Sequence, residues 1–282
     1  MSTIANQRPA TMPETTDWQD LDRAALSRAY DNSGAVADSA AIVAGWRARS
    51  AAFRERHAEA LDLAYGPGER QRIDVFRCGQ PSAPMLAFLH GGYWQRNDRR
   101  GFSCMAEGPL ALGLDVALVG YTLAPEASLT AIVAEARAAL ALLRADGGGR
   151  RLVVSGWSAG GHLAAQVADG ADAGLAISGL FDLAPIAGTN LNDALSLSAE
   201  EIAALSPIRH LSPGAPPVAV LYGADELPEL RRQSDAYHAA RRALGLDGPL
   251  IPVTGANHFT VLDALIDPEG AIARTAARLA GL

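Results

Sequence analysis

The stretch Arg151-Leu-Val-Val-Ser-Gly-Trp-Ser-Ala-Gly-Gly-His-Leu163 decides the fold. It joins an apolar segment, typical of a buried strand, to a run of small residues typical of a helix start, with the pattern G-x-S-x-G at the junction. A glycine two positions before Ser158 and another two positions after it permit a sharp turn that lifts the serine hydroxyl above the strand. Because the following helix directs its N-terminus at this turn, developing negative charge is favoured there. This setting predicts Ser158 as a nucleophile, in preference to a buried serine in a glycine-rich turn.

Strand-like and helical segments alternate on both sides of this turn. Continuous apolar runs are typical of parallel strands that are buried on both faces. The alternation therefore predicts an α/β fold, with a mostly parallel central sheet, helices on both faces, and ligands at the carboxyl ends of the strands. The expected strands are 61–65 and 72–76 (a hairpin), 85–89, 116–120, 151–155, 175–178, 218–222 and 250–253, and the expected helices include 129–144, 162–167, 231–242 and 271–279.

The 282 residues are expected to form a single domain with two additions to its central sheet. Residues 1–60 would provide a loose arm, to about residue 16, and a helical segment from Asp20 to about Arg56 that is a candidate cap over the site. Residues 184–217 interrupt the alternation and carry a capping-box pattern at 198–201. We expect this segment to be an insertion near the active site that can wall off a pocket.

The composition excludes several classes of function. The formal net charge is −7 and the sequence pI is about 5.4, which gives no electrostatic basis for binding nucleic acid or an anionic membrane. All 24 basic residues are arginine, so a lysine Schiff base and a P-loop lysine are both excluded. The two cysteines, Cys78 and Cys104, form no metal-binding pattern, and the N-terminus lacks a signal-peptide core. We therefore expect a cytoplasmic protein without a membrane span.

A second motif, H-G-G-Y-W at His90–Trp94, directly follows the apolar run 85–89. Paired glycines allow the backbone to approach a ligand and to turn N–H groups toward it. Such groups, aimed in advance at a tetrahedral oxyanion, form an oxyanion hole. We assign Gly92 and Tyr93 as donors together with Ala159, the residue after the nucleophile. His90 and Gly91 are expected to support the loop, with His90 ordering it by hydrogen bonding rather than acting as the catalytic base.

The general base is expected on a loop at the carboxyl ends of the strands, because it must reach the nucleophile. In hydrolases with this type of serine turn, the chain order is serine, acid, histidine. Three histidines lie well beyond the nucleophile, and only His258 occupies a loop between a strand and a helix; His210 falls in the insertion and His238 in a helix. The sequence therefore predicts His258 as the base.

The acid is expected just after the penultimate strand, where its carboxylate would fix the histidine tautomer and stabilise the imidazolium. Asp225 in Gly223-Ala-Asp-Glu226 fills that position, although it could also serve as a helix N-cap. Asp182, which follows the preceding strand, is the main rival, and Glu226 is a weaker one. We predict Asp225 as the acid.

These motifs together resemble the kynurenine formamidases (arylformamidases), in the hormone-sensitive-lipase-like branch of the α/β hydrolases. The resemblance rests on His90–Trp94, on Gly156–His162, on the segment Gly223–Pro228 and on the loop Gly255–His258, and it covers about residues 20–280. It implies the α/β-hydrolase fold and the triad. The sequence departs from the branch at Tyr93, where the branch usually has a third glycine, and this variant points toward formamidases.

The resemblance implies hydrolysis of an aryl formamide such as N-formylkynurenine, through a formyl-enzyme, in tryptophan catabolism. No metal and no organic cofactor are expected, the partner is a small-molecule substrate, and a homodimer is expected by analogy. A carboxylesterase or amidase acting on small acyl groups is the alternative, and a non-catalytic ligand-binding protein on the same fold is a remote one. A formyl group needs little room, whereas an aryl amine needs an aromatic wall. The aromatic residues expected to bind substrate are Trp94, Trp157, Phe181 and Phe259.

Overall fold

The computed structural model describes residues 17–57 and 61–282, and their central feature is an eight-stranded sheet. The strand order is β1-β2-β4-β3-β5-β6-β7-β8, with β2 antiparallel to both its neighbours and all other pairs parallel. The predicted α/β-hydrolase fold class is confirmed. The strands are β1 (Leu63–Ala64), β2 (Arg72–Phe76), β3 (Met85–Leu89), β4 (Asp115–Val119), β5 (Leu152–Trp157), β6 (Ala173–Ile177), β7 (Val218–Gly223) and β8 (Leu250–Val253).

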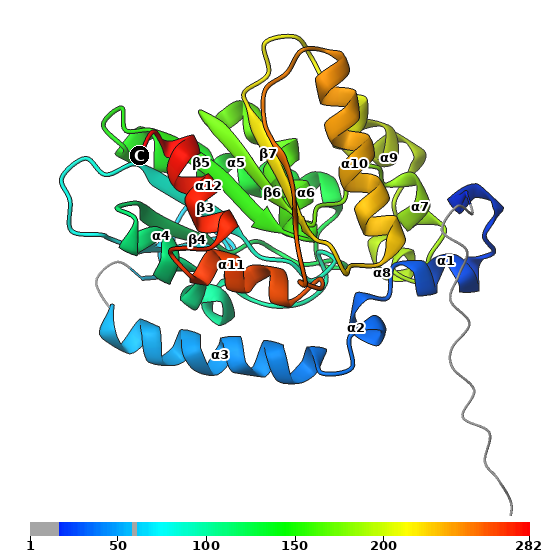
Figure 1. The fold of residues 1–282 in the computed structure, drawn as a ribbon, viewed down its shortest axis with the longest axis horizontal. Coiled ribbons are helices and arrows are strands. Elements are labelled where there is room, and N and C mark those ends of the chain that lie inside the picture. Colours follow the sequence, from blue (N-terminus) through cyan, green and yellow to red (C-terminus); the bar gives the residue numbers. More distant parts are fainter. Residues whose placement is uncertain (1–16, 58–60) are drawn as a thin grey trace, which may run out of the picture.

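Helices cover both faces of the sheet (Figure 1). The α-helices are α1 (Arg23–Ala29), α2 (Asn32–Ala35), α3 (Ser39–Arg56), α4 (Glu107–Ala111), α5 (Leu129–Asp146), α6 (Ala159–Gln166), α7 (Ala184–Ala187), α8 (Asn192–Leu195), α9 (Ala199–Leu205), α10 (Pro228–Ala243), α11 (Asp263–Ile266) and α12 (Ala271–Ala280). Short 3-10 helices are η1 (Trp18–Asp20), η2 (Arg99–Ala106), η3 (Ala168–Gly170), η4 (Pro207–Arg209) and η5 (Thr260–Leu262). No helix in the two described ranges is both long enough and apolar enough to cross a membrane.

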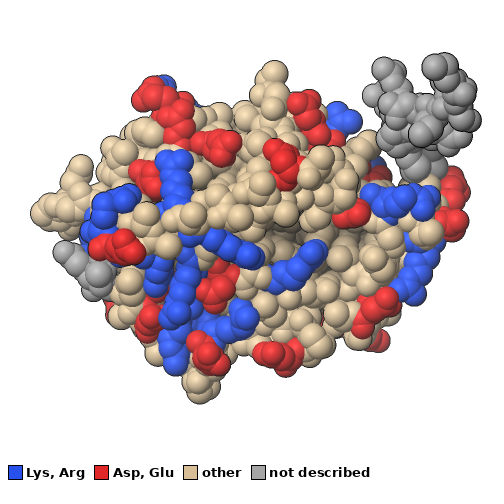
Figure 2. Space-filling model, turned by 90° about the horizontal axis from the view of Figure 1, so that it is seen from below, with Lys and Arg blue, Asp and Glu red and all other residues tan. Residues whose placement is uncertain are grey.

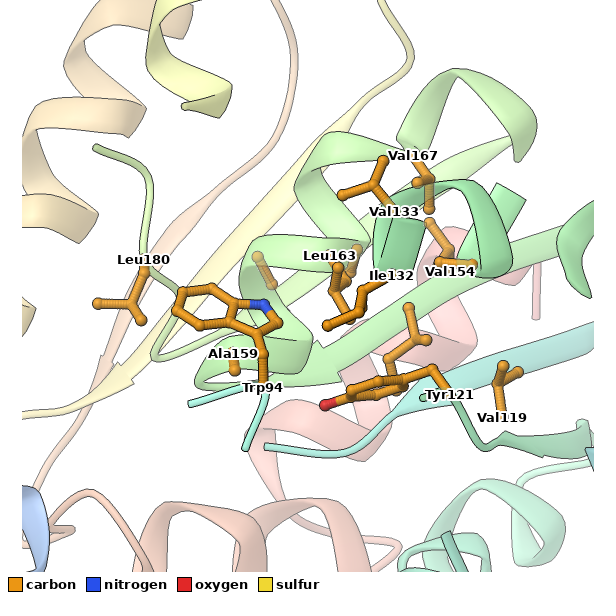
Figure 3. Close-up of a cluster of buried hydrophobic side chains, with 14 of the residues drawn as sticks. Trp94, Val119, Tyr121, Ile132, Val133, Val154, Ala159, Leu163, Val167 and Leu180 are labelled. Carbon is orange, nitrogen blue, oxygen red and sulfur yellow. The ribbon is translucent and has the colours of Figure 1, made fainter. Parts of the chain in front are cut away.

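Alternation along each strand divides the apolar core into two clusters. In β3, Ala87 and Leu89 join the cluster beneath α5 and α6, whereas Leu86 and Phe88 join the cluster beneath α3, α4 and α12. Successive side chains of a strand point to opposite faces, so a strand covered on both faces must be apolar throughout. This explains why the central strands read as unbroken apolar runs. Figure 3 shows part of the α5–α6 cluster.

The helix α3 lies along one side of the molecule and is fastened there by its own inward side chains (Figure 1). Trp46, Ser50 and Phe53 are buried, and the Ser50 hydroxyl donates to the Gly101 carbonyl at 3.0 Å. Near its end, Arg54 forms an ion pair of 2.5 Å with Asp74, whose side chain is fully buried in β2. This ion pair, which Asp74 shares with Arg99 at 3.1 Å, ties the C-terminal turn of α3 to the sheet.

The two predicted additions to the sheet can be placed in part. Residues 1–16 of the expected arm lie outside the described residues, and the helical segment that follows consists of α1, α2 and α3. Segment 184–217 contains α7, α8, α9 and η4. Its capping box is confirmed: the Ser198 side chain accepts from the Glu201 backbone, and the Glu201 side chain accepts from the Ser198 backbone.

Candidate active site

Ser158 sits on a strained turn between β5 and α6. Its backbone has φ 57° and ψ −117°, a conformation that costs a non-glycine residue about 1–3 kcal/mol. The turn is held because the Ser158 N–H donates to the Ile177 carbonyl at 2.8 Å and the Ser158 carbonyl accepts from the His162 N–H at 3.0 Å. Its side chain therefore stands at the carboxyl end of β5, at the start of a helix.

The two flanking glycines are required by backbone crowding. A Cβ on Gly156 would lie under 3.0 Å from the carbonyl oxygens of Gly160 and Leu89, and a Cβ on Gly160 would meet the carbonyls of Leu89 and His90 equally closely. These obstacles are backbone atoms, which cannot move aside as a flexible side chain would. The steric reason for the G-x-S-x-G pattern is thus visible in the structure.

His258 is fixed on the loop after β8 by contacts on two sides. Its backbone carbonyl accepts from the Trp157 indole N–H at 2.8 Å, and the two rings lie 5.0 Å apart. Its Nδ1 lies 3.0 Å from Oε2 of Glu226, and both side chains are almost fully buried. A carboxylate on Nδ1 holds the proton there and leaves Nε2 as the basic nitrogen.

The prediction of Asp225 as the acid is wrong, because the carboxylate that contacts His258 is that of Glu226. The backbone N–H of Asp225 donates to the Ala256 carbonyl at 3.0 Å, and its side chain is exposed. The next residue, Glu226, turns inward, and its Oε1 accepts from the Ser178 hydroxyl at 2.5 Å and from the Gly223 N–H at 2.6 Å. In the turn after β7, Glu226 therefore occupies the position beside His258 that was expected of Asp225.

The other rivals are occupied elsewhere. The carboxylate of Asp182 pairs with Arg209 at 2.9 Å and accepts from the Ala184 N–H at 3.2 Å. His210 is exposed, and its Nε2 lies 2.5 Å from the Ala203 carbonyl, while His238 lies within α10. Of the three late histidines, His258 alone faces the buried carboxylate.

The expected oxyanion loop presents backbone N–H groups beside Ser158. Gly92 and Tyr93 have positive φ values of 122° and 51°, and both residues line the same cavity as Ser158 and His258. Within the described ranges, the N–H groups of Gly92, Tyr93 and Ala159 donate to no protein acceptor. Backbone N–H groups without a protein acceptor, on residues near the serine, are what an oxyanion hole requires.

His90 lies behind this loop in a fully buried position. Its ring stacks on Tyr121 with 4.3 Å between centroids, and its Nδ1 donates to the Gly91 carbonyl at 2.9 Å. That carbonyl also accepts from the Asn97 side chain at 3.1 Å. Burial lowers the pKa of His90 to about 4, so the ring is neutral near pH 7. These contacts fix the orientation of the Gly91 carbonyl.

A cavity of about 320 Å³ opens beside Ser158, and the N-terminal helices form one of its walls. Trp157 and Phe259 line it, as the sequence predicts, and no residue of segment 184–217 does so. The wall opposite the sheet comes instead from α2 and α3. The complete lining is Asn32, Ser33, Ser39, Ala40, Val43, Arg47, Gly92, Tyr93, Arg96, Asn97, Trp157, Ser158, His258 and Phe259.

Two of the four aromatic residues predicted to bind substrate belong to the core instead. Trp94 is fully buried in the α5–α6 cluster, where Leu180 and Ala159 accompany it (Figure 3). Phe181 is also fully buried and stacks on Tyr237 with 4.2 Å between ring centroids. Neither side chain lines the cavity. Apolar position alone does not distinguish a core ring from a pocket ring, which is why both were misplaced.

Comparisons with known proteins agree with the fold described above. A family model described as alpha/beta hydrolase fold matches residues 86–207. The kynurenine formamidase of Salmo salar is 30% identical over 229 residues, covering 74% of this chain and 78% of the relative. The chain belongs to the α/β hydrolases. The kynurenine formamidase of Danio rerio is 28% identical to this hydrolase over 241 residues, covering 78% of the chain and 82% of the relative.

A solved structure agrees over almost the whole hydrolase. A protein from Silicibacter sp. TM1040, described as a thioesterase, superposes with a TM-score of 0.81 at 29% identity, covering 88% of this chain and 97% of the other. The fold is therefore that of the family.

The sequence predicts the helical segment from Asp20 to about Arg56 as a candidate cap over the site, but it does not single out the residues that line the cavity. Asn32, Arg47 and Arg96 all line it, yet none belongs to a recognisable motif. The spacing of Ala40, Val43 and Arg47 along one helical face was the only available signal, and it resembles that of any surface helix.

Proposed function

We propose that this α/β hydrolase is a serine hydrolase that cleaves an aryl formamide of the N-formylkynurenine type. The observation that carries the proposal is that His258, paired with the buried carboxylate of Glu226, lines one cavity together with Ser158, Gly92 and Tyr93. The likeness to proteins named kynurenine formamidase supports the choice of substrate class.

The catalytic sequence follows from the protonation states of these groups. His258, with its Nδ1 proton directed at Glu226, takes the Ser158 proton as the hydroxyl attacks the formyl carbon. The oxyanion forms beside the N–H groups of Gly92, Tyr93 and Ala159. The imidazolium then protonates the departing arylamine, which leaves a formyl ester on Ser158. Water attacks that ester with His258 again as base, and formate is released.

Charge in the cavity fits a substrate whose leaving group carries a carboxylate. Arg47 and Arg96 line the cavity, and no aspartate or glutamate is among its lining residues. Across the described ranges, neither arginine forms an ion pair, whereas Arg49 and Arg54 on the same helix α3 each pair with a carboxylate. The face that carries α3 holds many arginine side chains (Figure 2). Two unpaired guanidinium groups beside the nucleophile suit an amino-acid carboxylate, which arginine binds well.

Hydrolysis of small acyl esters is the second candidate, and the likeness to a thioesterase from Silicibacter sp. TM1040 supports it. The same serine chemistry would serve an ester. A purely binding role is disfavoured, because Ser158 and His258 line one cavity and His258 contacts the buried carboxylate of Glu226.

Kinetic assays of the purified protein test the proposal. We expect N-formylkynurenine to be hydrolysed with a higher kcat/KM than short-chain 4-nitrophenyl esters, and both activities to be lost in Ser158→Ala. Ester hydrolysis with no formamide hydrolysis would reject the formamidase and leave the esterase. Formamide hydrolysis that persists in Ser158→Ala would reject the nucleophile.

A further inference from the structure

Ser178, the residue that follows β6, is a buried serine in a backbone conformation that ordinarily suits glycine. Its φ is 50°, and the residue is fully buried. Non-glycine residues persist in this left-handed region only where the surrounding structure holds them, and such positions cluster at active sites. The Ser178 N–H donates to the Leu221 carbonyl at 2.7 Å, which helps to hold the turn. The chain keeps a serine where a glycine would fit with less strain, and this directs attention to the hydroxyl.

The Ser178 hydroxyl has one hydrogen-bond partner among the described residues, the carboxylate of Glu226. The Ser178 Oγ lies 2.5 Å from Glu226 Oε1, and an ionised carboxylate can only accept, so the hydroxyl donates. The same Oε1 accepts from the Gly223 N–H at 2.6 Å. Because Ile177 pairs with Leu221 in the parallel ladder of β6 and β7, the two donors come from adjacent ends of neighbouring strands.

These two donors leave the second carboxylate oxygen for the histidine. Glu226 Oε2 lies 3.0 Å from His258 Nδ1, while Oε1 is fixed between Ser178 and Gly223. A glutamate side chain has one more rotatable bond than an aspartate, so more conformational freedom must be lost to aim its carboxylate. A single contact with the backbone would leave the carboxylate free to swing about that contact. The hydroxyl of Ser178 removes this freedom.

Resting on the proposed serine chemistry, we propose that Ser178 is the positioning residue that makes Glu226 the working acid of the triad. Its hydroxyl donates a charge-assisted hydrogen bond that holds Oε1 at the end of β6, so that Oε2 faces His258. Ser178 is not among the residues that line the cavity, so it does not meet the substrate there. Its effect on the reaction passes through Glu226.

Two substitutions separate the hydroxyl from the backbone. Ser178→Ala removes the hydroxyl and keeps the strained backbone, whereas Ser178→Gly removes the hydroxyl and relieves the strain. In both we expect kcat to fall about 10–100-fold with KM changed by less than about threefold, because a hydrogen bond to a charged group is lost. The assay uses the formamide or the 4-nitrophenyl ester, whichever the unmodified protein hydrolyses faster.

Ser155→Ala is the matched control for these kinetics. Ser155 is equally buried, in β5, and its hydroxyl has no partner within the described ranges, so kcat should stay within about twofold. An unchanged kcat in Ser178→Ala would overturn the proposal. Full activity in Ser178→Gly would overturn it as well, because backbone strain would then explain the loss in Ser178→Ala.

A double variant tests whether Ser178 acts through Glu226. Once Glu226→Gln has removed the acid, adding Ser178→Ala should lower kcat by less than about threefold further, because the effects of interacting residues do not add. If the full loss is repeated in that background, Ser178 supports the fold of the site and not the acid, and the proposal fails.

Proton NMR without substrate keeps the test independent of the proposed reaction. The His258 Nδ1 proton directed at Glu226 should give a far-downfield resonance, assigned by its loss in His258→Gln. We expect it to shift or to broaden beyond detection in Ser178→Ala and to stay in place in Ser155→Ala. An unchanged resonance in Ser178→Ala, or none in the unmodified protein, would reject the positioning role. Failure to hydrolyse the formamide alone would reject only the proposed function.

Discussion

Two regions of different origin border the same cavity. The sheet edge carries Ser158, Glu226 and His258 on the loops that follow β5, β7 and β8. The N-terminal wall consists of α2 and α3, which contribute side chains from a part of the chain more than 100 residues earlier. Strained backbone and buried hydrogen bonds hold the first region, whereas helix packing holds the second.

The two regions differ in how freely their residues can be substituted. At the sheet edge, crowding leaves almost no freedom, since even a Cβ on Gly156 or Gly160 would strike backbone atoms. Arg47, on the N-terminal wall, and Arg96, on the loop after β3, are exposed and can be replaced without disturbing the core. We infer that the sheet edge sets the chemistry and that the wall selects the substrate.

The largest expected effect comes from the acid. Glu226→Gln keeps the size of the side chain but no longer enforces the Nδ1–H tautomer of His258, so kcat should fall about 10⁴-fold, as for comparable triads. Steady-state kinetics on the preferred substrate measure this. Asp225→Asn is the matched control one residue away, and its kcat should stay within about a factor of two because the side chain is exposed. The reverse pattern would restore Asp225 as the acid.

A smaller effect concerns the pH dependence of stability, through His162 in α6, the helix that follows Ser158. Burial lowers the pKa of His162 in α6 from 6.5 to about 4. Between these values the unfolded chain binds the proton and the folded protein does not, so stability falls as the pH drops from 6.5 toward 4. The shift corresponds to about 3 kcal/mol.

Urea unfolding between pH 7 and pH 4.5 measures this contribution. His162→Gln removes the titrating group, so its free energy of unfolding should fall less steeply on acidification than that of the unmodified protein, whatever the absolute stability of the variant. His90, whose pKa burial also lowers to about 4, stays in place and keeps part of the slope. Identical slopes in the two proteins would show that His162 is not the source.

The smallest expected effect concerns the two arginines that line the cavity, Arg47 on α3 and Arg96 on the loop after β3. Arg47→Gln and Arg96→Gln should each raise KM for a carboxylate-bearing formamide about tenfold with little change in kcat, because the lost interaction is present before and during reaction. A neutral analogue should be unaffected. Arg49→Gln serves as the control on the same helix, since Arg49 pairs with Glu107 and does not line the cavity. A loss of kcat in either cavity variant would contradict the inference that the sheet edge alone sets the chemistry.

Local sequence predicted the sheet edge better than the wall. The turn at Ser158 and the loop at His90–Trp94 are dictated by residues adjacent in the chain, so motif reasoning found them. The choice between Asp225 and Glu226 depended on which of two neighbouring side chains the turn after β7 directs inward. That direction is set by the bond from the Asp225 N–H to the Ala256 carbonyl, a contact with a distant strand connection.

For a similar reason, the sequence predicts a cap within residues 1–60 but not which of its residues line the cavity. Whether α3 covers the cavity depends on where its partners lie, above all on Arg54 reaching the buried Asp74 in β2. Trp94 and Phe181 were predicted to bind substrate but are buried in the core. Their burial is decided by packing against helices, which leaves no periodic pattern in the sequence of a short loop. Contacts between distant segments, rather than local preferences, account for each of these errors.

The two sides of α3 have a practical consequence. Trp46, Ser50 and Arg54 attach the helix to the body of the protein, whereas Val43 and Arg47 line the cavity. Because the two sets share almost no positions, the cavity-lining residues of α3 can be substituted while the residues that pack against the protein are kept. A library confined to a few codons of one helix could then redirect this hydrolase to new acyl compounds with its reacting groups untouched.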